Sequence, residues 1–377
     1  MNASNAELLG YLTIVRDPRI ERKKLHLLSD ILFIAVCASL CGCDTWEDIY
    51  DFGEVREEWL KQYIKLEHGI PSPDTIARVF SLINPDEFET AFRNWVASLY
   101  EVTNDNRIIA IDGKRVRGAH GEGKAAIHMV GAFAAEAGLA LAQVKTADKS
   151  NEITAIPELL DALLLKGCII TLDAMGCQRA IVEKIISGKG DYVISLKGNQ
   201  GTLHDDVKLF LETEHKKNFK ETKHDYYETI EKGHGRVESR RYWITDHIEW
   251  LNNRTDWSGL KTIGLVESER YVKGETSIER RCFICSIKPD ANQFATAVRQ
   301  HWSIENNLHW QLDVTFNEDK LRARVKNAAQ NLSILRRMVL NTLKKETSSN
   351  SSLRLKRKRA GWSEEYLLKL MALLFKF

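Results

Sequence analysis

The chain has no long hydrophobic run, little net charge and no regular pattern of cysteines. Its longest apolar stretch, residues 31–43, covers about 13 residues, whereas a membrane-spanning helix needs about 20. We therefore expect a buried helix there, and nothing at the N-terminus resembles a signal peptide. The seven cysteines are odd in number and lack a repeating framework, which fits a protein of the reducing cytoplasm with no membrane partner.

Bulk charge does not point to any class of partner. The 54 Lys and Arg residues nearly balance the 52 Asp and Glu residues, so the formal net charge is only +2. With 28% charged and 44% hydrophobic residues, the composition is that of an ordinary globular protein. Basic residues are nevertheless dense at 354–359; such a run can bind phosphate or form a solvated face.

The hydrophobic pattern divides the chain into three parts. Residues 1–100 are expected to form a helical domain, in which the paired short helices around 68–95 either bind DNA or simply pack. Residues 101–346 alternate between strands and helices, which predicts a mixed α/β sheet that includes a hairpin of strands 127–134 and 139–145. A β-rich insertion is expected at about 215–288, with strands at 236–245, 261–267 and 279–287. Residues 347–377 are expected to be a basic linker followed by a terminal helix.

Two aspartates stand where predicted strands end. Asp112 follows the apolar run 108–111, and Asp173 follows the run 168–172. In α/β sheets, ligands and catalytic groups gather beyond the carboxyl ends of the strands. Two sheltered carboxylates repel each other unless a cation neutralises them, and Mg²⁺ prefers such oxygen ligands. The alternative is that each aspartate merely begins a turn, which is common at strand ends.

A third acid, Glu305, lies in a helix predicted at about 291–310, with Trp302 and His309 at helical spacing on either side. Three carboxylates can hold two metal ions about 4 Å apart, an arrangement that supports in-line phosphoryl transfer. Other acids nearby compete for the third place, and they rank lower because they lie beyond the helix core or in a polar turn. These competitors are Asp313, Glu318 and Asp319.

The order of these motifs resembles the DDE transposases of bacterial insertion sequences, and among them the H-repeat-associated transposases. The resemblance covers essentially the whole chain and is carried by the strings IDGK, LDAMG, SLKGNQ, EKGHGRVESRR and HWSIENNLHWQLDVTFNED. It implies a ribonuclease-H-like mixed-sheet core in which Asp112, Asp173 and Glu305 are the catalytic metal ligands. It also implies Mg²⁺ as cofactor, with two ions expected and Mn²⁺ able to substitute.

The resemblance further implies double-stranded DNA as the partner, both element ends and target, and a homo-oligomer when DNA is bound. Many relatives carry a Tyr–Arg–Glu–Lys signature around the third acid, but here Val298 and His301 stand at the first two positions. Arg299 and His301 are the candidates to replace its phosphate contacts. Charged strand residues can instead form a solvated face, and Trp302 can pack in the core rather than stack on a base. The expected DNA contacts are Lys114, Arg115, Arg117, Lys197, Asn199, Arg236, Arg241, Arg299, His301 and Trp302.

The sequence thus predicts a metal-dependent DNA transposase that cuts phosphodiester bonds at element ends and transfers the strands to target DNA. Two alternatives remain open. A nuclease on the same core would cut DNA and never join it. A catalytically idle DNA-binding relic of a transposase would keep the acids and do neither.

Overall fold

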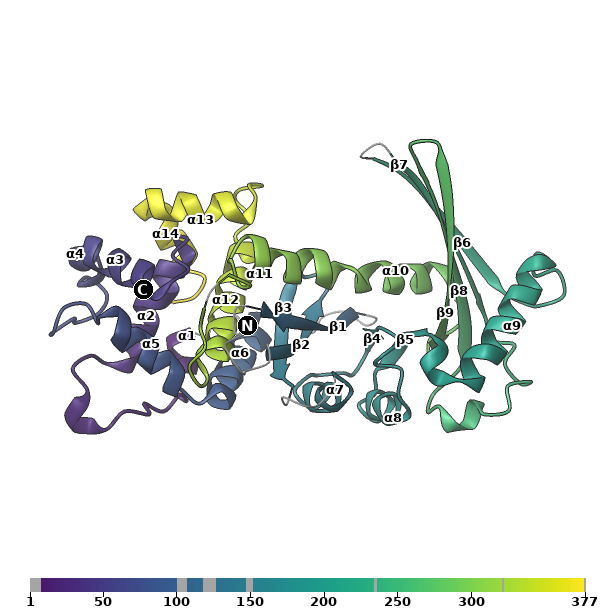
Figure 1. Ribbon diagram of the computed structural model, residues 1–377, viewed down its shortest axis with the longest axis horizontal. Helices are drawn as coiled ribbons and strands as arrows, with labels where there is room; N and C mark the ends of the chain where they lie inside the picture. The colour runs from purple at the N-terminus through teal and green to yellow at the C-terminus, as the bar shows by residue number, and fades with distance from the viewer. Residues whose placement is uncertain are drawn as a thin grey trace, which may run out of the picture.

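The computed structural model describes residues 8–99, 107–117, 127–146, 152–233, 236–320 and 322–375. The molecule is elongated, with a helical end, a central part built on a sheet, and a long twisted β ribbon that projects at the other end (Figure 1). No helix in the described ranges is long and apolar enough to cross a membrane.

The helical end contains a central helix that is buried almost all round. This helix, α2 (Leu28–Leu40), has no polar face wide enough to meet solvent, as expected for residues 31–43. Local capping starts its neighbours: Thr45 and Asp48 form a capping box before α3, and Ser72 caps α5 ahead of Pro73. The N-terminal helices of this end are α1 (Leu8–Leu12), α2, α3 (Trp46–Val55), α4 (Glu57–Leu60), α5 (Pro73–Leu82) and α6 (Pro85–Leu99), and two C-terminal helices described below pack on α2.

A nine-stranded mixed sheet runs through the rest of the molecule, in the order β3-β2-β1-β4-β5-β9-β8-β7-β6. The pairs β1–β4 and β4–β5 are parallel, and all the other pairs are antiparallel. The strands are β1 (Arg107–Val116), β2 (Ile127–Ala134), β3 (Leu139–Lys145), β4 (Cys168–Leu172), β5 (Asp191–Leu196), β6 (Asp225–Gly233), β7 (Arg236–Thr245), β8 (Thr262–Val272) and β9 (Glu275–Cys285). The mixed α/β class predicted from the sequence is confirmed.

Helices cover the two faces of the sheet differently. α7 (Glu152–Asp161) packs on β2 and β3, and α8 (Arg179–Ser187) packs beside it on β5. α10 (Ala291–His301) crosses the opposite face over β1, β4 and β5 and reaches the ribbon strands β6 and β7. α12 (Ala328–Lys345) joins the helical end to the central sheet, because it contacts α2, α5 and α6 as well as β3.

The ribbon is longer than its sequence pattern predicts. Strands were expected at 236–245, 261–267 and 279–287, but β8 and β9 run on to a tight turn at 273–274, and β6 was not among the expected strands, although it lies in the region expected to be β-rich. β6 is almost entirely exposed, so it carries no apolar alternation for a pattern to detect. α9 (Thr202–Lys216), which packs on β8 and β9, was also missed.

The C-terminal basic run is helical rather than a linker. Residues 353–362 form α13 (Leu353–Trp362), which is followed by α14 (Glu364–Met371). The buried Arg357 donates hydrogen bonds to Ser39 O and Thr315 O and pairs with Asp44 at 2.6 Å. The run therefore fastens the C-terminal helices to α2, and the expectation of a free basic linker was wrong for this part of it.

Candidate active site

The alternation of side chains along the central strands places two acids on the face that α10 covers. Ile108 on β1 and Ile169 on β4 pack in the α10 core, and every second residue along a strand points the same way. Asp112 lies four residues after Ile108 on β1, and Asp173 lies four residues after Ile169, directly past the end of β4. Both carboxylates therefore lie on the α10 side, just past the buried core.

Asp112 does not end its strand, contrary to expectation. β1 continues to Val116, and Asp112 is paired with Gly131 of β2. The parallel pairing of β1 with β4 nevertheless stops at Ala110 and Thr171. Asp112 thus stands where β1 and β4 separate, and Asp173 stands directly beyond the last residue of β4.

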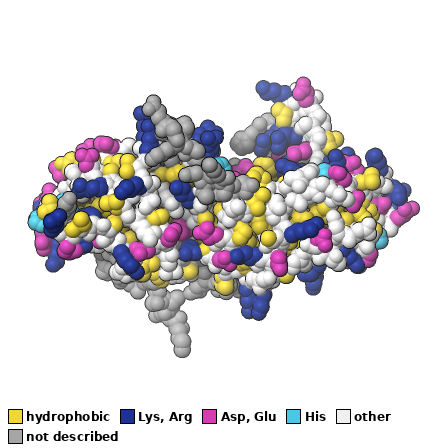
Figure 2. Space-filling view, turned by 60° about the horizontal axis from the view of Figure 1, so that its bottom comes forward, with side chains coloured by type: hydrophobic (Ala, Val, Ile, Leu, Met, Phe, Trp, Pro, Cys, Tyr) yellow, Lys and Arg dark blue, Asp and Glu magenta, His cyan; other side chains and the backbone are white. Residues whose placement is uncertain are grey.

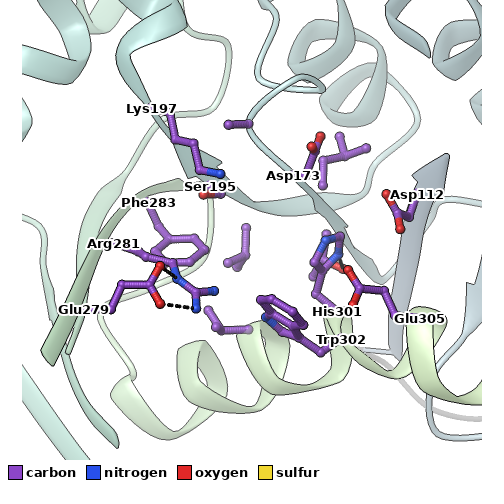
Figure 3. A pocket seen from close by; sticks show the side chains of 15 residues that line it. Asp112, Asp173, Ser195, Lys197, Glu279, Arg281, Phe283, His301, Trp302 and Glu305 are labelled. Carbon is purple, nitrogen blue, oxygen red and sulfur yellow. Dashed lines mark hydrogen bonds and ion pairs between the residues drawn. The ribbon is translucent and has the colours of Figure 1, made fainter. Parts of the chain in front are cut away.

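Glu305 comes from the helical segment that follows α10. Residues Glu305–His309 form a single π-helical turn before α11 (Trp310–Val314); such turns are rare and are frequently found at functional sites. All three acids line one cavity of about 360 Å³. Figure 3 shows Asp112, Asp173 and Glu305 around a common space, with His301 and Trp302 on the α10 side.

Repulsion between carboxylates is built into this cavity. Burial raises the pKa of Asp112 to about 7, and the negative charges of Glu152, Asp173 and Glu305 add to the effect, although the Gly113 N–H opposes it. The raised pKa means that the charged form of Asp112 is disfavoured in this cavity. A bound cation would therefore stabilise the ionised carboxylate by offsetting its burial and the neighbouring negative charges.

Asp173 is held by its own turn. Its Oδ1 accepts hydrogen bonds from the backbone N–H groups of Met175 at 3.0 Å and Gly176 at 3.2 Å. Asn199 donates its Nδ2 to Ala174 O at 2.8 Å, so it braces the LDAMG loop. The loop that follows β5 is thereby tied to the loop that carries Asp173.

Two histidines close to the acids are neutral: His301 lines the cavity, and His309 lies beside Asp112. Burial lowers the pKa of His301 to about 4, and its Nδ1 lies 3.0 Å from the Thr171 hydroxyl. Burial likewise lowers the pKa of His309 to about 3, and its Nδ1 lies 3.6 Å from Asp112 Oδ2. His301 therefore brings no positive charge to the position where relatives have an arginine.

A fourth carboxylate, which the sequence analysis did not single out, adjoins the three acids. Glu152 begins α7 and lies against Gly113, where an added Cβ would come within 1.9 Å of its Oε1. His128 Nδ1 lies 3.2 Å from the same oxygen. Burial raises the pKa of Glu152, and so does the charge of Asp173, whereas His128 lowers it. The only hint in the IDGK string was Gly113, because a glycine next to the first acid leaves room for another side chain such as Glu152.

Lys114 lies elsewhere than predicted. Its side chain is buried, and its Nζ pairs with Asp313 at 2.6 Å and with Glu318 at 3.0 Å. Glu318 is fully buried; burial raises its pKa, but Arg337 and Lys114 outweigh this and hold the value at about 2. Lys114 is thus a structural cation and its assignment as a DNA contact was wrong, while Glu318 belongs to this ion cluster and not to the cavity lining.

The remaining predicted contacts fall into two groups. Arg115, Arg117 and Lys197 are exposed, and Lys197 lines the same cavity as the three acids (Figure 3). Trp302 is 41% exposed and lies under the Arg281 guanidinium at 5.0 Å, so it does not pack in the core. The others, Arg236, Arg241 and Arg299, belong to ion pairs on the ribbon and α10.

The carboxylate oxygens that line the cavity are the type of ligand that a hard divalent metal ion prefers. Among the residues that the structure describes, no three His, Cys, Asp or Glu side chains are close enough to form a ready-made metal centre. Mg²⁺, however, is usually bound by one or two carboxylates together with waters and substrate phosphates. A cavity lined by repelling carboxylate oxygens meets that requirement once a phosphate enters.

Comparison with solved structures finds a cryo-EM structure of a piggyBac transposase synaptic complex with hairpin DNA. Its TM-score is 0.44 at 10% sequence identity, with 100% of this chain and 79% of that chain covered. A similarity at this level does not establish a shared fold.

Sequence comparisons are much closer. The chain is 45% identical to "Putative transposase YncI" of Escherichia coli O157:H7, over 97% of this chain and 94% of that protein. It is 42% identical to "H repeat-associated putative transposase YhhI" of Escherichia coli K12, over 97% and 98%. Residues 9–96 match the family described as "DDE_Tnp_1-associated", and residues 103–342 match the family described as "Transposase DDE domain". The chain therefore belongs to the DDE transposase family, among the H-repeat-associated transposases.

Proposed function

We propose that this chain is an active DNA transposase, which cuts phosphodiester bonds at the ends of its element and joins the freed 3′-hydroxyls to target DNA. The observation that carries the proposal is that Asp112, Asp173 and Glu305, from two strands and a π-helical turn, line one cavity. A ribonuclease-H-like core accounts for the parallel β1–β4–β5 strands with the acids at their separating ends.

In this proposal Asp112, Asp173 and Glu305 would hold the divalent metal ions, Mg²⁺ or Mn²⁺, which when bound would supply the Lewis-acid chemistry for phosphodiester cleavage. The chain's own groups orient those ligands. Two backbone N–H groups fix Asp173 Oδ1, and His309 lies beside Asp112 Oδ2. Lys197 at the cavity wall is placed to offset phosphate charge. Because two element ends must be cut and joined together, we propose a homo-oligomer on DNA.

The test is a strand-cleavage and strand-transfer assay on duplexes that carry the element ends, with Mg²⁺, with Mn²⁺ and with Ca²⁺ as a non-supporting ion. The wild-type protein should nick the DNA and produce joined products. Loss of this ligand should raise the reaction barrier by several kcal/mol. Because each 1.4 kcal/mol of barrier lowers the rate tenfold, Asp173→Ala should cleave several orders of magnitude more slowly. It should still bind the duplex at least as tightly, because an acid near the phosphate is removed.

The same assay separates the alternatives. Cleavage without joined products would identify a nuclease. Binding without cleavage in either metal would identify an idle relic. Cleavage by Asp173→Ala at the wild-type rate would overturn the carboxylate mechanism.

A further inference from the structure

A second cavity, of about 200 Å³, continues from the catalytic one along the ribbon. The two share Arg281, Val298 and Trp302 as lining residues. One wall is the α10-facing side of β7, β8 and β9, and the other wall is the C-terminal end of α10 with Asn306. We name this cavity the arginine groove because five arginines line it: Arg236, Arg240, Arg270, Arg281 and Arg299.

Strand register places the ribbon arginines on one face. Glu238 is paired with Arg270, Arg240 with Ser268, and Val266 with Arg281; directly opposed residues of antiparallel strands share a face. Nearer the sheet, the same face is closed by α10, where Phe294 packs edge-on against Tyr242. The face opens where α10 ends, and there its side chains change from aromatic to arginine.

Acidic partners hold these arginines in place without using up their donors. Buried Glu238 pairs with Arg240 at 2.5 Å and with Arg270 at 3.1 Å. Glu231 bridges Arg240 and Arg299 at 3.1 and 2.9 Å. Each guanidinium has five N–H donors in a planar fork, so donors remain free for a further anion. Arginine is the side chain best suited to bidentate phosphate binding.

The opposite face of the same ribbon provides an internal comparison. Its ion-pair ladder has Arg241 and Arg280 sharing three glutamates, Glu228, Glu267 and Glu269. In the arginine groove the proportion is reversed, with five arginines sharing Glu231, Glu238 and Glu279. Arginines therefore outnumber their glutamate partners only on the ribbon face that borders the catalytic cavity, among these ion-paired residues. Figure 2 shows Lys and Arg side chains gathered on the projecting ribbon beside a notch in the surface.

We propose that the arginine groove binds the backbone of a single DNA strand, through the phosphates that adjoin the phosphodiester in the catalytic cavity. The inference rests on the proposed function. A groove of about 200 Å³, walled on both sides and continuous with the proposed site of cleavage, suits one strand rather than a whole duplex. Glu231, Glu238 and Glu279 hold the arginines ready, which reduces the entropy lost when a phosphate binds.

The test measures how tightly the full chain binds a short labelled single-stranded DNA of mixed sequence. The binding constant is determined by fluorescence anisotropy in EDTA at KCl concentrations from about 50 to 200 mM. The test variant is Arg270→Gln with Arg299→Gln, since both side chains are partly exposed. Arg280→Gln is the matched control, because Arg280 is similarly exposed and similarly paired with a ribbon glutamate on the opposite face. Circular dichroism and thermal melting show whether each variant is folded.

The double variant should bind at least about tenfold more weakly, and the slope of log K against log salt should fall by about 1.4, or about 0.7 for each lost phosphate contact. The control should match the wild type. Arg270→Lys with Arg299→Lys should keep the slope but recover only part of the affinity, because lysine keeps the charge without the fork.

An unchanged slope in the double variant, or an equal loss in Arg280→Gln, would overturn the proposal. The same titration is repeated with the oligonucleotide annealed to its complement. If the double variant loses affinity for this duplex but not for the single strand, the assignment to a single strand is wrong. Cleavage is scored separately with Mg²⁺ on end-containing duplexes. A chain that never cleaves would refute the proposed function while leaving the binding result readable, and normal cleavage with an unchanged slope would refute the groove alone.

Discussion

Neutralising Asp112 should stabilise the metal-free protein at neutral and alkaline pH. The pKa of Asp112 is raised from 3.8 to about 7, first by burial and then by neighbouring carboxylates. The folded protein therefore holds this proton more tightly than the unfolded chain does, and stability falls as pH rises through the interval between the two values. Asp112→Asn removes that loss, since an amide of the same shape carries no charge to desolvate.

The magnitude follows from the size of the shift. About three pKa units at 1.36 kcal/mol each give roughly 4 kcal/mol as an upper limit. With an unfolding entropy of about 2.1 cal/mol/K per residue, this corresponds to a rise in Tm of roughly 5 °C for a chain of this length. The gain should be smallest near pH 4 and should level off above about pH 7.

The measurement is a series of thermal melts in EDTA between pH 4 and pH 8.5, on the wild type, Asp112→Asn and a control. Asp51→Asn serves as the control, because Asp51 is an exposed aspartate in a distant helix. Melts with Mg²⁺ complete the experiment: the wild type should gain stability from the ion, and Asp112→Asn should gain much less. Equal Tm values for wild type and Asp112→Asn at pH 8 would refute the view that Asp112 is electrostatically strained.

Three further predictions concern side chains around the site and the ends of the chain. Gly113→Ala should cost about 1–3 kcal/mol through its clash with Glu152, and Glu152→Ala should restore most of that in chemical denaturation; an additive double mutant would contradict this contact. Lys114→Met should cost about 3–5 kcal/mol, because Glu318 loses a partner inside the protein; a urea midpoint that does not move would show that the ion pair is unimportant. Arg357→Met should loosen the C-terminal helices and speed proteolysis at residues 347–352, as limited digestion would show, whereas wild-type resistance would disprove the anchoring role.

The sequence contained enough to find most of the candidate site. The apolar runs before Asp112 and Asp173 predicted two strands, and helical spacing placed Glu305 in one helix at about 291–310, where the structure has α10 followed by a π-helical turn. The hairpin at 127–145 matches β2 and β3 residue for residue. Each of these features depends on the periodicity of a few consecutive residues, which is local information.

Only the tertiary structure decided which charged side chains are exposed and which are buried. Lys114 follows the first acid along the chain, but its partner Glu318 lies far away in the sequence, and only folding shows that the two neutralise each other. The same holds for Arg357, which is buried between α2 and the turn after α11. Glu152 joins the acids because Gly113 has no side chain to exclude it. The cost of burying a charge depends on partners that only the folded chain supplies, so no local pattern can predict it.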